Sequence, residues 1–233
     1  RNSGRRSLSG NFWRTCFSLR TRLTMMKAAD LPFDYNMCEI LERNLENRAD
    51  KTALLSDYGT RTFREVSDEV NKVGNALARL GLGFGECVAI LSPDRPEWVS
   101  TFFATAKIGG VALGMNTLLS VQEYDYILKD ARVRVLVVYE KMLDLVKPIL
   151  SNHHILKKVI VIGDDQATNY TTFNDWIQGE DTKLEAEQTH RDDFCSLHYS
   201  SGTTGMPKGV LHAHKDYPLI AQLSGVDLFA VSY

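Results

Sequence analysis

The sequence predicts an α/β fold with a mostly parallel sheet flanked by helices. From about residue 37 onward, runs with helical periodicity alternate with short apolar runs, which is the pattern of a sheet whose strands are joined by helices. The run VRVLVVY at 133–139 is apolar at nearly every position, as expected for a strand covered on both faces. A composition of 44% hydrophobic and 24% charged residues is that of a globular protein with a real core.

The first half of this pattern begins with a helix within 62–81. Five apolar residues recur there with helical spacing: Val66, Val70, Val73, Leu77 and Leu80. Gly81 stands where a C-terminal cap belongs. A strand is predicted at 87–91, followed by SPDRPEW, in which Asp94 can cap and Pro96 can begin a second helix.

The apolar segment 99–119 is the one stretch that resembles a membrane span. Lys107 at its centre and the Gly109–Gly110 pair argue against that interpretation. The segment instead predicts a buried helix followed by a buried strand at 111–115. Ser120 and Glu123 then form a capping box for a helix that extends to about Lys129.

The second half continues with a strand at 133–139, a helix at about 141–151 and a strand at 158–163. Residues 164–191 are polar and weakly patterned, and they predict a connecting stretch. A strand from Phe194 to Tyr199 follows. The run KGVLHAH at 208–214 alternates like a second strand, and KDYPLIAQLSGV at 215–226 predicts a helix.

The basic residues are concentrated at the start of the chain. Residues 1–27 carry six Arg and Lys27 and no acidic residue, whereas the remainder has 20 basic and 29 acidic side chains, a net charge of −9. We expect residues 1–27 to be a disordered extension, in which Met25 or Met26 could serve as an internal start. An organellar transit peptide is the alternative, because such peptides are also rich in Arg and Ser.

Residues 28–233 carry a net negative charge, whereas a nucleic-acid-binding protein needs a basic surface, so a small-molecule partner is expected. Because segment 99–119 is not expected to span a membrane, no transmembrane helix is predicted. Four cysteines form no C-x-x-C pair and no metal-binding spacing, which favours a reducing compartment. We therefore expect a cytoplasmic protein, with organellar targeting by the basic segment as the alternative.

The motif YSSGTTGMPKGV at 199–210 concentrates hydroxyls, glycines and a lysine directly after a predicted strand. Glycines allow successive backbone N–H groups to point into one concavity, which makes an anion site. Hydroxyl donors and one positive charge complete a predicted phosphate cradle, whose members are Ser200, Ser201, Gly202, Thr203, Thr204, Gly205, Lys208 and Gly209. Each hydrogen bond to a charged group contributes about 1.5–3 kcal/mol.

Two other interpretations of the motif are weaker. A Walker A loop needs glycine where Pro207 stands and a hydroxyl residue where Gly209 stands, which disfavours a P-loop NTPase. A flexible linker does not normally fix Pro-Lys-Gly between two strands. His212 and His214 alone do not make a metal site, and no metal site is predicted. For His198 and Tyr199 we expect structural packing roles.

Residues 199–210 resemble the phosphate-binding signature of the adenylate-forming superfamily, which includes acyl-CoA synthetases, luciferases and the adenylation domains of peptide synthetases. The pattern of residues 35–233, including the helix and strand within 62–91, is similar to the N-terminal region of that family. The segment GVALGMNTLLSVQEYDYILKD, with Asn116–Leu119, Tyr124 and Tyr126, is similar to the benzoate-type aryl-CoA ligases.

The resemblance implies a two-step reaction with ATP, Mg²⁺ and coenzyme A. A carboxylate is first converted to an acyl-adenylate, and coenzyme A then takes the acyl group. The loop belongs to the β- and γ-phosphates in that scheme, and Lys208 and Thr204 are its catalytic residues. The expected substrate is an aromatic acid such as a benzoate. A fatty-acyl-CoA ligase or a non-catalytic ATP-binding module is the alternative.

The resemblance also implies that important parts lie beyond residue 233. The acyl-pocket segment, a Mg²⁺-binding acid, a ribose-binding Asp, a hinge and a C-terminal domain with a catalytic lysine belong to the family layout. We therefore expect residues 28–233 to be the N-terminal portion of an AMP-binding domain, inactive alone, with the C-terminal domain absent. The oligomeric state is not predicted.

Overall fold

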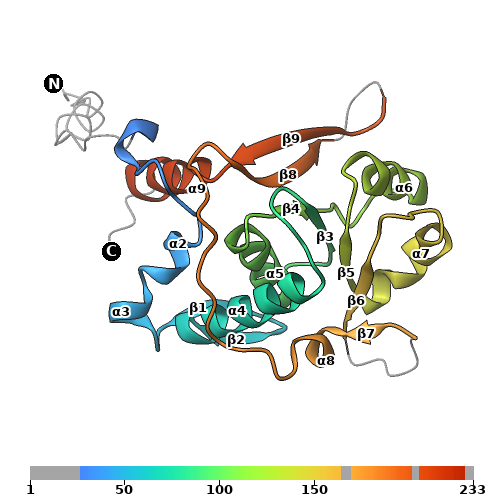
Figure 1. Ribbon diagram of the computed structural model, residues 1–233, viewed down its shortest axis with the longest axis horizontal. Coiled ribbons are helices and arrows are strands. Elements are labelled where there is room, and N and C mark those ends of the chain that lie inside the picture. Colours follow the sequence, from blue (N-terminus) through green and yellow to red (C-terminus); the bar gives the residue numbers. More distant parts are fainter. Residues whose placement is uncertain (1–26, 164–168, 201–204, 229–233) are drawn as a thin grey trace, which may run out of the picture.

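A computed structural model describes residues 27–163, 169–200 and 205–228, and it has the expected α/β architecture (Figure 1). The main sheet has seven strands in the order β7-β6-β5-β3-β4-β8-β9, and β9 alone runs antiparallel to its neighbour. These strands are β3 (Cys87–Leu91), β4 (Val111–Gly114), β5 (Val135–Tyr139), β6 (Lys158–Ile162), β7 (Thr171–Thr172), β8 (Phe194–Ser200) and β9 (Lys208–Ala213). Of the predicted basic extension, only Lys27 lies within the described residues.

Helices cover both faces of the sheet. Those on one face are α6 (Val121–Asp130) and α7 (Glu140–Leu150), and those on the other are α4 (Phe63–Arg79), α5 (Pro96–Lys107) and α8 (Phe173–Ile177). Leu136 and Val138 of β5 pack with α6 and α7, whereas Val135 and Val137 pack with α4 and α8. Strand β5 is therefore buried on both faces, which confirms the prediction from its continuous apolar run.

Smaller elements surround this core. The chain enters through a 3-10 turn (Ala28–Asp30), α2 (Glu39–Glu42) and α3 (Leu45–Arg48), and then forms an antiparallel hairpin of β1 (Thr52–Ser56) and β2 (Gly59–Thr62). At the other end, α9 (Asp216–Ile220) continues into a π-helical segment (Ala221–Leu228). The predicted strand–helix transition at 208–226 is confirmed, whereas the β1–β2 hairpin was not predicted.

The helix termini confirm two of the expected caps. The backbone N–H groups of Gly81 and Leu82 donate to the carbonyls of Ala78 and Leu77, at 2.8 and 3.2 Å, and Gly81 has a φ of 67°. This is the glycine cap predicted for α4. Ser120 and Glu123 exchange the hydrogen bonds of the predicted capping box.

The expected cap at Asp94 is wrong. Arg95 holds the N-cap position of α5, with φ −113° and ψ 157°, and Pro96 is the first helical residue. A proline forces the residue before it into an extended conformation, which is the conformation of an N-cap. Asp94 therefore lies one residue too early to be the N-cap, and it is exposed.

The prediction that 164–191 is only a connection is wrong for 171–177, where β7 and α8 form. Thr172 caps α8 by accepting from the backbone N–H of Asp175, at 3.2 Å, and Phe173 and Trp176 are buried against α4 and β6. Strand β7 pairs with β6 and adds the last strand to that edge of the sheet.

The chain that follows α8 returns across helix α4 to reach β8, as the orange segment in Figure 1 shows. Polar side chains on α4 hold it there. The Asn71 amide donates to the carbonyl of Thr182 at 2.7 Å, and the Asn75 amide donates to those of Asp181 and Lys183, at 2.9 and 3.1 Å. This row satisfies backbone carbonyls that no sheet neighbour reaches.

Lys107 is buried at the end of α5, with 2% of its side chain exposed. Its ammonium lies 2.5 Å from a carboxylate oxygen of Glu42 and 2.7 Å from the amide oxygen of Asn71. The segment 99–119 thus forms a buried helix and strand, as predicted, and its central charge joins α2, α4 and α5. Among the described residues no helix is both long enough and apolar enough to cross a membrane.

Candidate functional site

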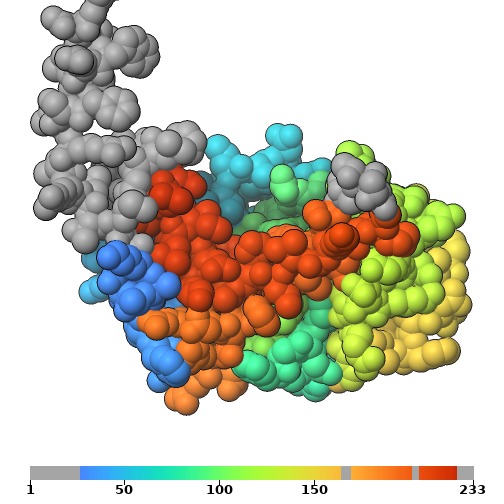
Figure 2. All heavy atoms as spheres, turned by 90° about the horizontal axis from the view of Figure 1, so that it is seen from above, coloured from blue at the N-terminus to red at the C-terminus, as the bar shows by residue number. Residues whose placement is uncertain are grey.

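The glycine-rich motif connects β8 to β9, as the predicted strand–loop–strand arrangement requires. The two strands pair from Phe194–Ala213 to Ser200–Lys208, so the last pair lies directly beside the connecting loop. In Figure 2 these orange-red strands run across the surface of the molecule. The predicted site residues Ser201, Gly202, Thr203 and Thr204 lie outside the described residues.

Ser200 and Lys208 are brought together by this pairing. Directly opposed residues of an antiparallel pair project to the same face, so the Ser200 hydroxyl and the Lys208 ammonium leave the hairpin on one side. Both residues, and Gly205, are exposed. A hydroxyl donor and a cation at the mouth of a glycine-rich loop are groups that suit a phosphate.

Gly209 has a packing reason as well. A Cβ atom at this position would lie 2.9 Å from Cδ1 of Leu197 and 3.4 Å from Cζ of Tyr199. Both are strand β8 side chains that cross the backbone of β9. Glycine therefore allows the two arms of the loop to approach closely.

A cleft of about 490 Å³ opens beside the hairpin, at the carboxyl ends of β3, β4 and β8. Ligands of open α/β sheets bind at such strand ends. The lining residues are Ser92, Pro93, Asp94, Trp98, Gly114, Met115, Asn116, Thr117, His198 and Tyr199. The sequence did not indicate this cleft, although 92–94 and 116–117 directly follow the strands predicted at 87–91 and 111–115.

Trp98 forms the apolar wall of the cleft. Its ring stacks on Phe102, with ring centroids 5.1 Å apart and an interplanar angle of 10°. The indole also lies against β4, where a Cβ atom at Gly114 would come within 2.9 Å of Cζ2. A large flat side chain and a glycine together shape a wall that suits an aromatic ligand.

His198 forms the polar wall. Its Nε2 lies 3.4 Å from both the Ser196 hydroxyl and the Tyr217 hydroxyl, which are 2.6 Å from each other. Burial, and then the neighbouring His212, lowers the pKa of His198, so the imidazole is neutral at pH 7. The structural role expected for His198 is present, and the side chain faces the cleft in addition.

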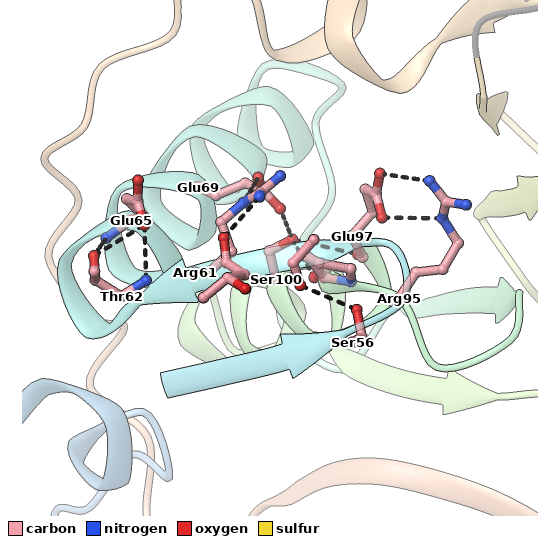
Figure 3. A network of polar contacts seen from close by, with 11 residues as sticks. Ser56, Arg61, Thr62, Glu65, Glu69, Arg95, Glu97 and Ser100 are labelled. Atoms are coloured by element: carbon pink, nitrogen blue, oxygen red, sulfur yellow. Dashed lines mark hydrogen bonds and ion pairs between the residues drawn. The ribbon is translucent and has the colours of Figure 1, made fainter. Parts of the chain in front are cut away.

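Arg95 fixes the loop that forms the rim of the cleft. Figure 3 shows its guanidinium donating two hydrogen bonds to Glu97, both at 3.2 Å. The guanidinium carbon lies 4.2 Å from the ring centroid of Tyr58, in the β1–β2 turn, and 5.0 Å from that of Tyr139. Contacts with two aromatic faces hold Arg95 between the β1–β2 hairpin and strand β5.

His212 and His214 have different partners. His212 lies beside His198, with ring centroids 5.4 Å apart, whereas His214 is fully buried and its Nδ1 accepts from the backbone N–H of Met37 at 3.0 Å. Within the described ranges, no three His, Cys, Asp or Glu side chains are grouped so that they could hold a metal ion.

We expect His214 to make the fold sensitive to acid. Burial lowers its pKa to about 4, whereas an unfolded histidine titrates near 6.5. The unfolded chain therefore binds a proton that the folded chain resists. The free energy of unfolding should fall as the pH decreases from about 6.5 to about 4, by up to about 3 kcal/mol from this residue.

The measurement is urea unfolding at pH 7 and pH 5. His214→Asn retains an oxygen acceptor for the Met37 N–H and cannot titrate, so it should lose less stability between the two pH values than the wild type. His154→Asn, at an exposed histidine, is the matched control. Equal losses for the wild type and His214→Asn would contradict the assignment.

Comparisons with known proteins identify the family of the chain. The family described as AMP-binding enzyme matches residues 41–231. Two ligases of Thauera aromatica are 35% identical to the chain: benzoate–CoA ligase over 84% of the chain and 37% of the relative, and 3-hydroxybenzoate–CoA/4-hydroxybenzoate–CoA ligase over 76% and 34%. The chain thus spans about a third of the length of these relatives.

A solved structure gives the same picture. The anthranilate CoA ligase AuaEII, crystallised in complex with anthranoyl-AMP, is 56% identical to this chain and superposes with a TM-score of 0.85. The similarity covers 87% of this chain and 39% of that protein. With a family match that extends over most of the sequence, the chain belongs to the AMP-binding enzyme family.

Proposed function

We propose that the complete protein carrying this chain activates an aromatic carboxylic acid with ATP and transfers the acyl group to coenzyme A. The main support is the β8–β9 hairpin, which presents Ser200 and Lys208 on one face at the mouth of a glycine-rich loop, beside a cleft with an aromatic wall. The similarity to benzoate, hydroxybenzoate and anthranilate CoA ligases supports the aromatic substrate class.

The chemistry has two steps. A carboxylate oxygen of the acid attacks the α-phosphorus of ATP, the bond to the β-phosphate oxygen breaks, and pyrophosphate leaves with the electron pair. The thiolate of coenzyme A then attacks the acyl carbon, and AMP leaves. Both steps depend on positioning and on neutralising the charge of the leaving group, without a covalent enzyme intermediate.

The motif supplies the charge neutralisation in this proposal. Lys208 and the hydroxyl of Thr204 stabilise the departing pyrophosphate, and the remaining cradle residues (Ser200, Ser201, Gly202, Thr203, Gly205 and Gly209) bind the β- and γ-phosphates. The exposed Ser200 and Lys208 fit that role. Mg²⁺ would neutralise ATP charge through phosphate oxygens and one or two carboxylates; the described residues contain no cluster that could hold it alone.

We also propose that residues 28–233 are the N-terminal portion of the AMP-binding domain and do not turn over alone. Strand β9 is an edge strand, and Met206, Val210 and Leu211 on and beside it are exposed. Exposed apolar side chains along an unpaired edge are the surface that a further part of such a domain would cover.

The test is carboxylate-dependent ATP–pyrophosphate exchange by the complete protein. The panel should contain benzoate, hydroxybenzoates, 2-aminobenzoate and fatty acids, and the 233-residue chain alone serves as the control. We expect exchange with aromatic acids by the complete protein only. Exchange with fatty acids alone would move the substrate class to acyl chains.

The remaining outcomes bear on the proposal itself. Binding of ATP without exchange for any carboxylate would show that the hairpin serves a nucleotide site with a different chemistry. Full ligase activity of the 233-residue chain would contradict the proposed domain division. ATP hydrolysis independent of any carboxylate would favour an NTPase.

A further inference from the structure

Tyr199 occupies a particular place in the hairpin. It is the residue before Ser200 at the end of β8, and it pairs with Gly209 of β9. Its ring crosses the backbone of that glycine, since a Cβ atom there would lie 3.4 Å from Cζ of Tyr199. We call the glycine-rich loop between β8 and β9 the phosphate loop. The Tyr199 side chain contacts both of the strands that flank it.

The hydroxyl of Tyr199 is held from outside the hairpin. It donates to Oδ2 of Asp130 at 2.5 Å, and Asp130 is the last residue of α6, 69 positions earlier in the chain. Burial, and then the hydrogen bond to Asp130, raises the pKa of Tyr199, so the phenol keeps its proton. A hydrogen bond to a carboxylate is about twice as strong as one between neutral groups.

The position of Asp130 is unfavourable for the helix itself. A negative charge at a helix C-terminus opposes the macrodipole and is therefore destabilising there. Lys129 on the same turn bonds Asp125 instead. The hydrogen bond from the Tyr199 phenol thus stabilises the negative charge of Asp130, which is unfavourable at the C-terminus of α6.

The same helix holds the cleft at its other end. Tyr124 is fully buried, and its hydroxyl donates to the carbonyl of the cleft residue Asn116 at 3.0 Å. Ser120 and Glu123 then fix the first turn of α6 directly after the cleft loop. One ten-residue helix, about 15 Å long, therefore connects the cleft loop to the base of the phosphate loop.

We propose that Tyr199 is a positioning residue for the phosphate loop, acting through its hydrogen bond to Asp130 at the end of α6. The inference rests on the proposed function, which gives the loop its phosphates. In Figures 1 and 2 the loop-proximal ends of strands β8 and β9 lie beside the yellow-green helix α6, as this connection requires. The helix fixes the distance between the group that binds phosphate and the cleft that receives the acid.

The first test is Tyr199→Phe in the complete protein, which removes only the hydroxyl. We expect kcat for ATP–pyrophosphate exchange to fall about tenfold with KM for ATP unchanged, because misplacement of a group used in the transition state lowers kcat. Asp130→Ala should give the same loss, and Asp130→Asn, which retains an oxygen acceptor, should restore most of the rate. Tyr126→Phe is the matched control, because Tyr126 lies on α6 and packs against the same core cluster as Tyr199.

The double variant Tyr199→Phe/Asp130→Ala distinguishes positioning from two separate effects. If the residues act through one bond, it should be no slower than either single variant. Additive losses, or wild-type kcat in Tyr199→Phe, would overturn the inference. So would a variant that loses thermal stability while its folded fraction retains the wild-type kcat.

A second measurement does not require activity. Amide hydrogen exchange at Ser200, Lys208 and Gly209 should be several-fold faster in Tyr199→Phe than in Tyr126→Phe, with Cys195–Leu197 unchanged. Equal rates of amide hydrogen exchange at these three residues in Tyr199→Phe and Tyr126→Phe would overturn the inference, even if the protein catalysed another reaction. Failure of the proposed function would instead appear as absence of exchange with pyrophosphate in the wild type, while this loosening remained.

Discussion

Replacing Lys208 by alanine should lower kcat for ATP–pyrophosphate exchange by about 100-fold in the complete protein. Removal of one preorganised donor that acts on charge developing in the transition state costs a factor of this order. Lys208 is exposed at the first residue of β9, opposite Ser200, so its loss leaves no cavity and no buried partner. The effect should fall on kcat rather than on folding.

Lys215→Ala is the matched control, because it removes a partly exposed lysine just beyond β9 that pairs with Asp192. A surface ion pair contributes about 0–1 kcal/mol to stability, so this variant should exchange like the wild type. Thr204→Ala, whose position lies outside the described residues, should resemble Lys208→Ala. Wild-type exchange in both loop variants would remove the loop from the mechanism.

The second large effect concerns the buried Lys107. Glu42→Ala should lower the free energy of unfolding by about 3 kcal/mol, because it leaves an ammonium group with 2% exposure without its carboxylate. Lys107→Met should cost less, about 1–2 kcal/mol, since it keeps the apolar stem and releases a carboxylate that is 37% exposed and can be solvated. The asymmetry identifies the lysine as the buried partner.

Urea unfolding of the two single variants and of the double variant measures this difference. The double variant should be more stable than Glu42→Ala alone, because removing the cation abolishes the uncompensated charge. Arg64→Met, which removes an exposed cation near Asp50, provides the surface control. If Glu42→Ala proved no more damaging than Arg64→Met, Lys107 would not depend on Glu42.

Much of the fold was predictable because its signals are local. Helix α4 was predicted from its apolar spacing and from Gly81, and β5 from a continuous apolar run that is typical of a strand buried on both faces. Helix α8 was missed because five residues are too few for a helical period to appear. Its signals were only Phe173, Trp176 and the Thr172–Asp175 cap.

The candidate site was predictable only where it is continuous in sequence. The loop arms form the predicted strands, and Ser200 and Lys208 meet as the motif indicates. The cleft could not be assembled in the same way, because Trp98, Asn116 and His198 come together only once β3, β4 and β8 are neighbours. The bond between Tyr199 and Asp130 depends equally on that topology.

The strand order also has a consequence for the nascent chain. Strand β4 pairs with β3 early in synthesis, but its other neighbour arrives late, since Ala112 pairs with Ser196. At 5–20 residues per second, the ribosome needs roughly 4–17 s to supply the intervening chain. During that interval β4 is an open edge that can pair wrongly. Among the described strands of this sheet, β8 and β9, which flank the proposed phosphate-binding loop, are therefore the last to be synthesised and paired.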